Sequence, residues 1–453
     1  MKELEKMNES RAVTRKIVLV GFIILTIAGW ILLRPNAPKI AASSQEQLYD
    51  NPVIGYENAG NNDPVARLQQ KLARGEAKLE YSEVDGYLSS VLRLLNIPVS
   101  SQGLVFSKTS FQLFRISPKN PRAIYFNDDV YVGWVRGGDF VELSTADPKL
   151  GGVFYMLEQT KTDQPKIIRN NECLQCHSSG ATRNVPGHIV RSVFPDERGY
   201  PIAQLGSRVI GHSNPLKERW GGWFVTGTHG SAQHLGNQIF SERDVLEKID
   251  LSVGANLKSL AKKVNLVGYL APHSDIVALM VLEHQTQMHN ALTRLNYETR
   301  IALNQNDAMN EALNRPKDEI SDSTKRRINN AADEVVKYLL FVDEAKLQAP
   351  IAGTSGFAAE FAAQGLKDKQ GRSLRDFDLE KRMFRYPCSY LIYSESFDAL
   401  PKMALDLVWQ KLWTILTGQA QAKEYAASSA ADRKAILEIL RATKRNLPAY
   451  FYR

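Results

Sequence analysis

The pattern of apolar and polar positions divides this chain into a membrane-spanning segment, a β-rich segment and a helical segment. Residues 17–33 are apolar and uncharged, and they are long enough to cross a bilayer as a helix. Lys2, Lys6, Arg11, Arg15 and Lys16 precede this run, so the positive-inside bias places the N-terminus in the cytoplasm. We therefore predict a cytoplasmic tail over residues 1–15 and a transmembrane anchor over residues 16–34.

A cleaved signal peptide is the alternative interpretation of the same run, because small residues follow it at 41–44. Both interpretations export the remainder of the chain. We expect a single-pass protein of the inner (cytoplasmic) membrane with its bulk in the periplasm.

Residues 35–65 are rich in Pro, Asn, Ala, Ser and Gly and have little apolar periodicity, which predicts a linker. After a helical pattern over 65–97, short β-branched and aromatic segments occur between Gly, Pro, Asp and Asn residues. Alternation of this kind is typical of antiparallel strands. The segments that predict strands are 123–126, 130–134, 140–143 and 153–156.

Beyond about residue 241 the apolar spacing becomes helical. The segments with this spacing are 242–263, 274–304, 322–346, 355–366, 396–417 and 432–444. The predicted fold class is therefore α+β, with one N-terminal transmembrane helix, a β-rich domain over 66–240 and a mostly helical domain over 241–453.

The chain has 453 residues, 43% of them hydrophobic, and a formal net charge of +8. Part of that excess lies in the first 34 residues, and the remainder is not concentrated into a basic stripe with interleaved aromatic residues. A nucleic-acid partner is therefore not expected. Only three cysteines occur, which gives no disulfide framework for an exported domain.

Two of the three cysteines lie in the sequence Cys173-Leu-Gln-Cys176-His177. Thiols at i and i+3 can form thioethers with the two vinyl groups of a porphyrin, and the adjacent imidazole then faces the iron. A zinc half-site, a redox dithiol and a structural disulfide are the alternatives. Zinc would need a second ligand pair, and a thioredoxin-type dithiol would need a strand and a helix around it, where Asn170 and Ser178 indicate loops.

On these residues the chain resembles c-type cytochromes. The resemblance implies one covalently attached haem c at Cys173 and Cys176, with His177 as the proximal iron ligand. Small soluble cytochromes of this kind use a downstream Met as the sixth ligand, but no Met occurs between Met156 and Met280. The departure favours a His/His haem or an open sixth position.

His229 is our first choice for the distal residue, so the predicted metal ligands are His177 and His229. It follows two Trp residues in a Gly-rich segment over 219–230. Glycines allow the backbone to approach a large flat ligand closely, and aromatic rings can stack against its edges. A turn histidine with aromatic neighbours is the equal alternative. The other candidates are His188, His212, His234 and His284.

His284 lies between Met280 and Met288 on one face of a predicted helix, and a hydrogen-bonded core histidine is the ordinary interpretation of that position. Guanidinium groups match carboxylates, so three arginines could pair with haem propionates. They are Arg183, Arg191 and Arg219. Cys388 has no partner and is predicted to be a buried inert thiol.

The leading functional hypothesis is an electron carrier that exchanges single electrons with a redox partner protein or a membrane electron-transfer complex. An enzyme of peroxidase or oxygenase type, with an open or displaceable sixth ligand, is the alternative. A haem sensor is a third class, although residues 1–15 offer no cytoplasmic output domain.

Overall fold

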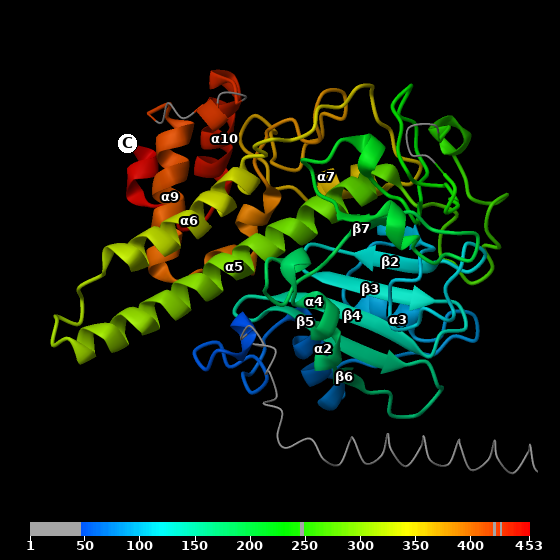
Figure 1. The fold of residues 1–453 in the computed structure, drawn as a ribbon, viewed down its shortest axis with the longest axis horizontal. Helices are drawn as coiled ribbons and strands as arrows, with labels where there is room; N and C mark the ends of the chain where they lie inside the picture. The colour runs from blue at the N-terminus through cyan, green and yellow to red at the C-terminus, as the bar shows by residue number, and fades with distance from the viewer. Residues whose placement is uncertain (1–46, 245–248, 420–422, 426–427) are drawn as a thin grey trace, which may run out of the picture. The chain divides into compact units, whose positions relative to one another are not determined.

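An antiparallel sheet forms the centre of the described structure, a computed structural model that covers residues 47–244, 249–419, 423–425 and 428–453. Within these residues the sheet has seven strands in the order β6-β5-β4-β3-β2-β1-β9 (Figure 1). The strands are β1 Gly103–Val105, β2 Arg122–Phe126, β3 Val130–Val135, β4 Phe140–Asp147, β5 Gly151–Glu158, β6 Ile167–Arg169 and β9 Trp223–Phe224. The four predicted strand segments correspond to β2, β3, β4 and β5, which confirms them.

Different helices pack against the two faces of the sheet. Alternate residues of the strands, among them Val132, Tyr155 and Leu157, pack with helices α2 (Pro64–Ala73) and α3 (Leu88–Leu94). The opposite face carries a row of residues in register across β2, β3, β4 and β5. In strand order the row is Phe126, Tyr131, Ser144 and Phe154.

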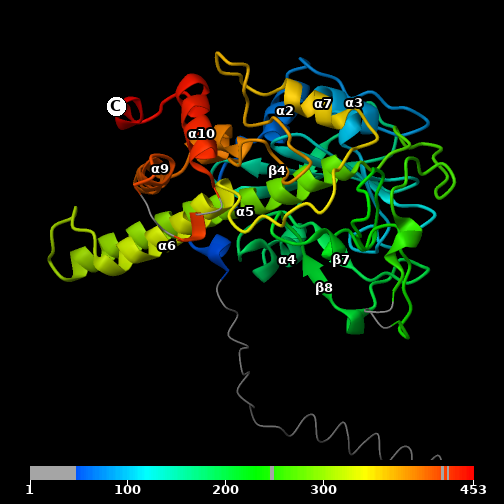
Figure 2. The same cartoon turned by 90° about the horizontal axis from the view of Figure 1, so that it is seen from above.

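Helix α5 (Ile276–Ala312) crosses this second face and extends beyond the sheet, where α6 (Asp322–Leu339) packs along it (Figures 1 and 2). The other α-helices of the described residues are α4 Leu174–His177, α7 Phe357–Ala363, α8 Glu395–Asp398, α9 Lys402–Leu416 and α10 Ala430–Thr443. A two-stranded ribbon, β7 (Arg191–Val193) with β8 (Ser207–Val209), completes the regular structure. The predicted α+β class, with an antiparallel sheet followed by a mostly helical part, is confirmed.

Residues Gln47–Arg453 form one compact unit. This unit contains both the predicted β-rich domain and the predicted helical domain. The two share a hydrophobic core, because α5 packs directly on the sheet. The predicted linker over 35–65 is packed from Gln47 onward. Ile54 and Tyr56 are buried, and the Tyr56 hydroxyl donates to the Gly152 carbonyl at 2.7 Å. These two apolar residues show no periodicity, and only the folded sheet gives them a place to be buried.

The helix predicted over 242–263 is wrong for the residues described there. They form only a short 3-10 turn at Leu251–Gly254. Asn256 has a positive φ of 53°, and its side chain is committed to the backbone of the loop at His229 and Gly230. Tertiary hydrogen bonds have therefore overridden the helical spacing of the apolar residues.

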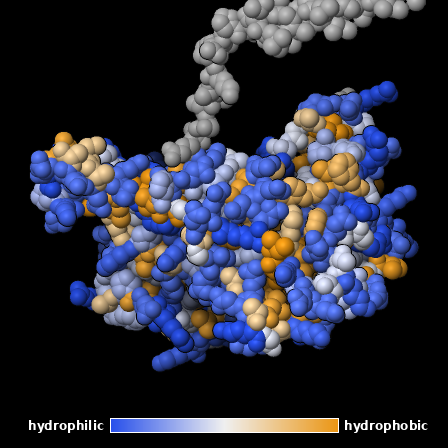
Figure 3. Space-filling view, turned by 90° about the horizontal axis from the view of Figure 1, so that it is seen from below, coloured by the Kyte–Doolittle hydropathy of each residue, from blue (hydrophilic) through white to orange (hydrophobic). Residues whose placement is uncertain are grey.

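The predicted tail and anchor, residues 1–34, lie outside the described residues. Among the residues that are described, no helix is long and apolar enough to span a bilayer. The face of the molecule drawn in Figure 3 is mostly hydrophilic, with hydrophobic residues in small separate groups.

The start of α5 depends on one buried carboxylate. Asp275 accepts hydrogen bonds from the backbone of Val277 at 2.8 Å and of Ala278 at 3.3 Å, which caps the helix. Its second oxygen accepts from the backbone of Thr354 and of Ser355, both at 2.7 Å. Asp275 thereby joins the helix that crosses the sheet to the segment that leads into α7.

Asp275→Ala should lower the free energy of unfolding by about 3 kcal/mol or more, because several buried N–H groups lose their acceptor at once. Urea denaturation followed by circular dichroism measures this loss. Ser321→Ala is the control, since the Ser321 side chain caps α6 through one backbone hydrogen bond and its loss should cost about 1 kcal/mol. Equal losses for the two variants would contradict this role of Asp275.

Candidate haem-attachment site

The Cys-X-X-Cys-His segment lies directly after the edge strand β6. The Asn170 side chain accepts from the backbone N–H of Glu172 at 2.8 Å and begins a tight turn that runs into α4. Helical spacing puts residues i and i+3 on one side of the turn. Cys173 is half-buried and Cys176 is exposed, and both are free thiols. The segment thus presents two thiols at the surface on a turn anchored by the buried Leu174.

The environment of Cys173 differs from that of a redox-active thiol. Burial and, to a smaller extent, the nearby Glu142 carboxylate raise the pKa of the Cys173 thiol to about 11. Reactive dithiols need a depressed pKa so that a thiolate is present at neutral pH. The raised pKa of Cys173 therefore disfavours the redox-dithiol alternative.

A hydrogen bond from Nδ1 fixes the orientation of the His177 ring. Nδ1 lies 2.9 Å from the Gly187 carbonyl, which can only accept, so Nδ1 carries the proton and donates. Nε2 has no hydrogen-bond partner among the described residues. Burial lowers the pKa of His177, which favours the neutral ring. A neutral imidazole with Nδ1–H held by a carbonyl is the arrangement that points an Nε2 lone pair at a metal.

The aromatic row on the sheet supports both His177 and a second histidine. The His177 ring lies 4.8 Å from the Phe154 ring, between centroids, and the His188 ring lies 6.0 Å from the same ring. His188 also packs against Tyr131 at 4.4 Å. Phe154 therefore lies beside two histidines that are eleven residues apart in the sequence.

Asn290 of α5 holds the backbone of His188. Its side-chain oxygen accepts from the His188 N–H at 2.9 Å, and its amide donates to the His188 carbonyl at 2.8 Å. The close approach depends on Gly187, where a Cβ would lie 2.2 Å from the Asn290 oxygen. The His188 ring, by contrast, is buried with no hydrogen-bond partner at either nitrogen.

Charged and apolar groups surround the motif on the same face of the sheet. Arg122 and Glu142 form a mostly buried ion pair next to Cys173 and His177, and the Arg122 Nε has no hydrogen-bond partner. The positive charge of Arg191 also acts on His177. Met156 lies in register with Glu142, and Ile168, in register with Met156, is 58% exposed. Two cations therefore adjoin the motif, on a face with an apolar strip formed by the partly buried Met156 and the exposed Ile168.

The structure does not bring His229 to the motif. Its Nδ1 donates to the Ala232 carbonyl at 2.7 Å, and its Nε2 accepts from the Asn256 N–H at 3.0 Å, so both ring nitrogens are used. The loop of His229 lies against Ile276 through Gly227, whereas the loop of His188 lies against Asn290. The helix between Ile276 and Asn290 rises about 21 Å. The ring centroids of His234 and His229 are 4.7 Å apart, so His234 is also remote from the Cys-X-X-Cys-His motif.

His212 and His284 form a separate pair inside the core. Their Nδ1 atoms lie 2.9 Å apart, and the His284 Nε2 lies 2.8 Å from the Ser389 hydroxyl. Burial and the charge of Arg219 lower the pKa of His212 to about 3, and burial places the pKa of His284 well below its ordinary value. The pair is therefore neutral and shares one proton between the facing nitrogens. This is the ordinary core arrangement that the apolar spacing around His284 predicts.

Of the three arginines predicted to bind propionates, only Arg191 stays available. Arg183 pairs with Glu334 at 2.5 Å, and Arg219 pairs with the buried Glu283. Arg191 is exposed and makes no ion pair within the described part of the chain. Cys388 is fully buried and burial raises its pKa to about 12, which agrees with an inert thiol.

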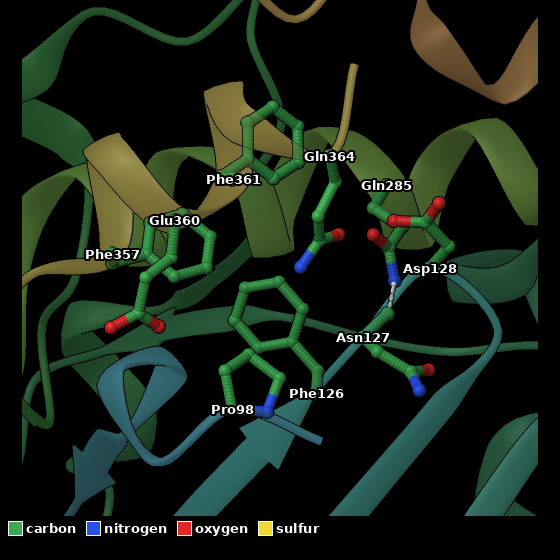
Figure 4. Close-up of a pocket in the computed structure, with 9 residues that line it drawn as sticks. All are labelled: Pro98, Phe126, Asn127, Asp128, Gln285, Phe357, Glu360, Phe361 and Gln364. Atoms are coloured by element: carbon green, nitrogen blue, oxygen red, sulfur yellow. Dashed lines mark hydrogen bonds between the residues drawn. The ribbon is translucent and has the colours of Figure 1, made fainter. Parts of the chain in front are cut away.

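A small pocket lies at the other end of the aromatic row, between Phe126 and the rings of α7 (Figure 4). Gln285 donates from this pocket to the Asn127 carbonyl at 2.7 Å and to the Tyr131 hydroxyl at 3.0 Å. Tyr131 in turn bonds His289 Nδ1 at 2.9 Å. Phe126 and Phe154 are three strand spacings apart, or about 14 Å. The pocket is therefore separate from the thiols, although a polar chain leads from it toward His188.

No group of three or more His, Cys, Asp or Glu side chains in the described ranges is arranged to hold a metal ion. A zinc site at the two thiols would therefore lack further ligands from this part of the chain. No protein-family model, curated protein or solved structure matches the chain. The interpretation of the site consequently depends on the geometry of its own residues.

Several residues of the site have no signal in the sequence. Phe154, Arg122 and Glu142 belong to strands whose alternation marks them only as residues of one face. Asn290 stands in an apolar helix pattern, where a polar residue at a buried position is a usable but unspecific signal. Register and tertiary packing alone bring them to the motif.

The neutral His212–His284 pair predicts acid sensitivity. Because the folded pKa of His212 is below the unfolded value, the unfolded state binds more protons, and stability present above pH 6.5 is lost as the pH falls toward 3. At pH 5 the loss attributable to His212 should be about 2 kcal/mol. Urea denaturation of wild type and His212→Asn at pH 7.5 and 5 measures the difference. His273→Asn, at a partly exposed position, is the control, and an unchanged acid slope in His212→Asn would refute the assignment.

Proposed function

We propose that this protein is a membrane-anchored, extracytoplasmic monohaem c-type cytochrome that acts in electron transfer. In this proposal one haem c is bound covalently through Cys173 and Cys176, with His177 as the proximal ligand. The observation that carries it is the state of His177, whose Nδ1 is held by the Gly187 carbonyl while Nε2 stays without a partner beside two free thiols.

The surroundings of the motif fit a haem in three respects. Phe154 provides an aromatic support next to the proximal ring. Arg191 and the unpartnered Nε of Arg122 are suited to donate hydrogen bonds to propionate carboxylates. The apolar strip at Met156 and Ile168 would gain cover from a porphyrin edge. When bound, a haem supplies one-electron redox chemistry, and these residues would bind and orient it.

The predicted anchor over residues 16–34 would hold the folded unit at the inner membrane, with the bulk of the chain in the periplasm. A redox partner protein or a membrane electron-transfer complex is the proposed partner. Cys176 is exposed, so an attached porphyrin would have an edge near the surface. Surface access of that kind suits exchange of electrons with a docked partner.

A second candidate function is a haem c enzyme of peroxidase or oxygenase type with an open or displaceable sixth ligand. The observation that favours it is the buried polar chain from Gln285 through Tyr131 to His289, which ends beside His188. Groups of this kind could hold or move a proton near a bound molecule. The two candidates differ in whether the iron has a free position.

Replacing the attachment thiols tests the central proposal. The full-length chain, produced with a haem-maturation system, should carry haem that survives denaturing electrophoresis and stains in the gel. Cys173→Ser and Cys176→Ser together should abolish this covalent signal, because no thioether can form. Cys388→Ser is the matched control and should retain it. An unstained wild-type band would reject the haem proposal.

The absorption spectrum with and without carbon monoxide separates the two candidate functions. An electron carrier should give a six-coordinate low-spin spectrum in both redox states, and carbon monoxide should leave it unchanged. An enzyme with an open position should give a high-spin spectrum that shifts with carbon monoxide. The second result would overturn the electron-transfer proposal while leaving the haem in place.

A further inference from the structure

The His188 ring is an unexplained feature of the core. The residue is 4% exposed, and neither Nδ1 nor Nε2 has a hydrogen-bond partner. Buried polar atoms in folded proteins nearly always have partners, and an orphaned pair on one ring calls for an explanation. Both nitrogens are available on a neutral ring, which is the form that binds metals.

The position of His188 relates it to the proposed haem. Gly187, the preceding residue, supplies the carbonyl that fixes His177. The rings of His177 and His188 pack against the same Phe154 side chain. The Asn290 side chain bonds both the N–H and the carbonyl of His188. The backbone of His188 is therefore held in place, while its ring nitrogens have no partner. The loop that orients the proximal imidazole therefore also positions a second imidazole.

The other histidines of the chain are less suited. His229 has both ring nitrogens bonded within its own region, and His212 and His284 bond each other. His234 lies with His229, far along α5 from the motif. His289 is held by Tyr131 through Nδ1, which leaves one nitrogen without a partner.

Met156 is the competitor from the same sheet face. Its sulfur already accepts a hydrogen bond from the Asn170 amide at 3.2 Å. Asn170 also begins the turn that carries the thiols, so this contact has a structural role. The orphaned nitrogens of His188 have no such alternative role.

We propose that His188 is the second axial ligand of the haem iron, which gives the protein His/His coordination; this inference rests on the proposed haem function. His289, whose Nε2 is also unpartnered and whose ring centroid lies 6.1 Å from that of His188, is the adjacent group for the remaining ring nitrogen. Two imidazole ligands leave no open position and lower the potential relative to His/Met. The site then favours electron transfer over chemistry at the iron.

The test uses the full-length, haem-loaded protein in detergent and compares wild type with His188→Gly. Wild type should be low-spin and indifferent to carbon monoxide. His188→Gly should keep its covalent haem but become high-spin and bind carbon monoxide, and added imidazole should restore the low-spin spectrum. His229→Gln is the matched control and should keep the wild-type spectrum, because both ring nitrogens of His229 are bonded within its own region.

The outcomes separate this inference from the proposed function. If the wild-type protein carried no covalent haem, the proposed function itself would be rejected. With haem retained, a low-spin His188→Gly without imidazole would overturn the ligand assignment alone. A high-spin wild type would overturn both the ligand assignment and the electron-transfer proposal, while leaving the haem in place. If His188→Gly fails to fold, near-infrared magnetic circular dichroism of wild type still decides. A bis-imidazole signature supports the proposal, and a thioether or single-imidazole signature rejects it.

Discussion

The structure depends on the complete enclosure of the middle of α5. Glu283, His284 and Gln285 are consecutive and wholly buried, and consecutive helix positions point about 100° apart. The helix is therefore surrounded on every side at this level, and each polar group must find a partner inside the protein because none can reach water. The positions of the neighbouring segments follow from that requirement.

The three side chains bond segments that are far apart in the sequence, and Gln285 bonds the Asn127 carbonyl and the Tyr131 hydroxyl. Glu283 pairs with Arg219, which also donates to the carbonyls of Asn214 and His212. His284 bonds His212 and Ser389. A buried ion pair contributes little net stability but is costly to break, so such contacts act mainly to select one arrangement. The polar core of α5 thus fixes the long loops that follow the sheet, where few strands or helices are present to do so.

The same helix links that core to the candidate haem site. Six residues beyond His284, Asn290 holds the loop of Gly187 and His188, and that loop orients His177. The site is therefore assembled from an edge strand, a tight turn, an irregular loop and the central helix. Rigid elements position the His177 imidazole while the thiols stay near the surface, which is compatible with the proposed attachment of a haem.

The amino-acid sequence by itself determined the local features: the strands β2 to β5, the amphipathic and apolar helices after residue 274, and the five-residue Cys-X-X-Cys-His motif from which the haem proposal starts. Periodicity and short motifs carry such information because it is written within a few residues. The helix expected over 242–263 failed because Asn256 bonds a distant loop, and the sequence holds no record of that contact.

The tertiary structure alone decided which histidines lie together. From composition, His229 was the best distal candidate, yet its nitrogens are used within its own region and about 21 Å of α5 separates its loop from that of His188. Arg122, Phe154 and Asn290 reach the motif through strand register and helix packing. Such proximity arises between residues far apart in the chain, and it is set by the way the core closes around α5, which no local pattern encodes.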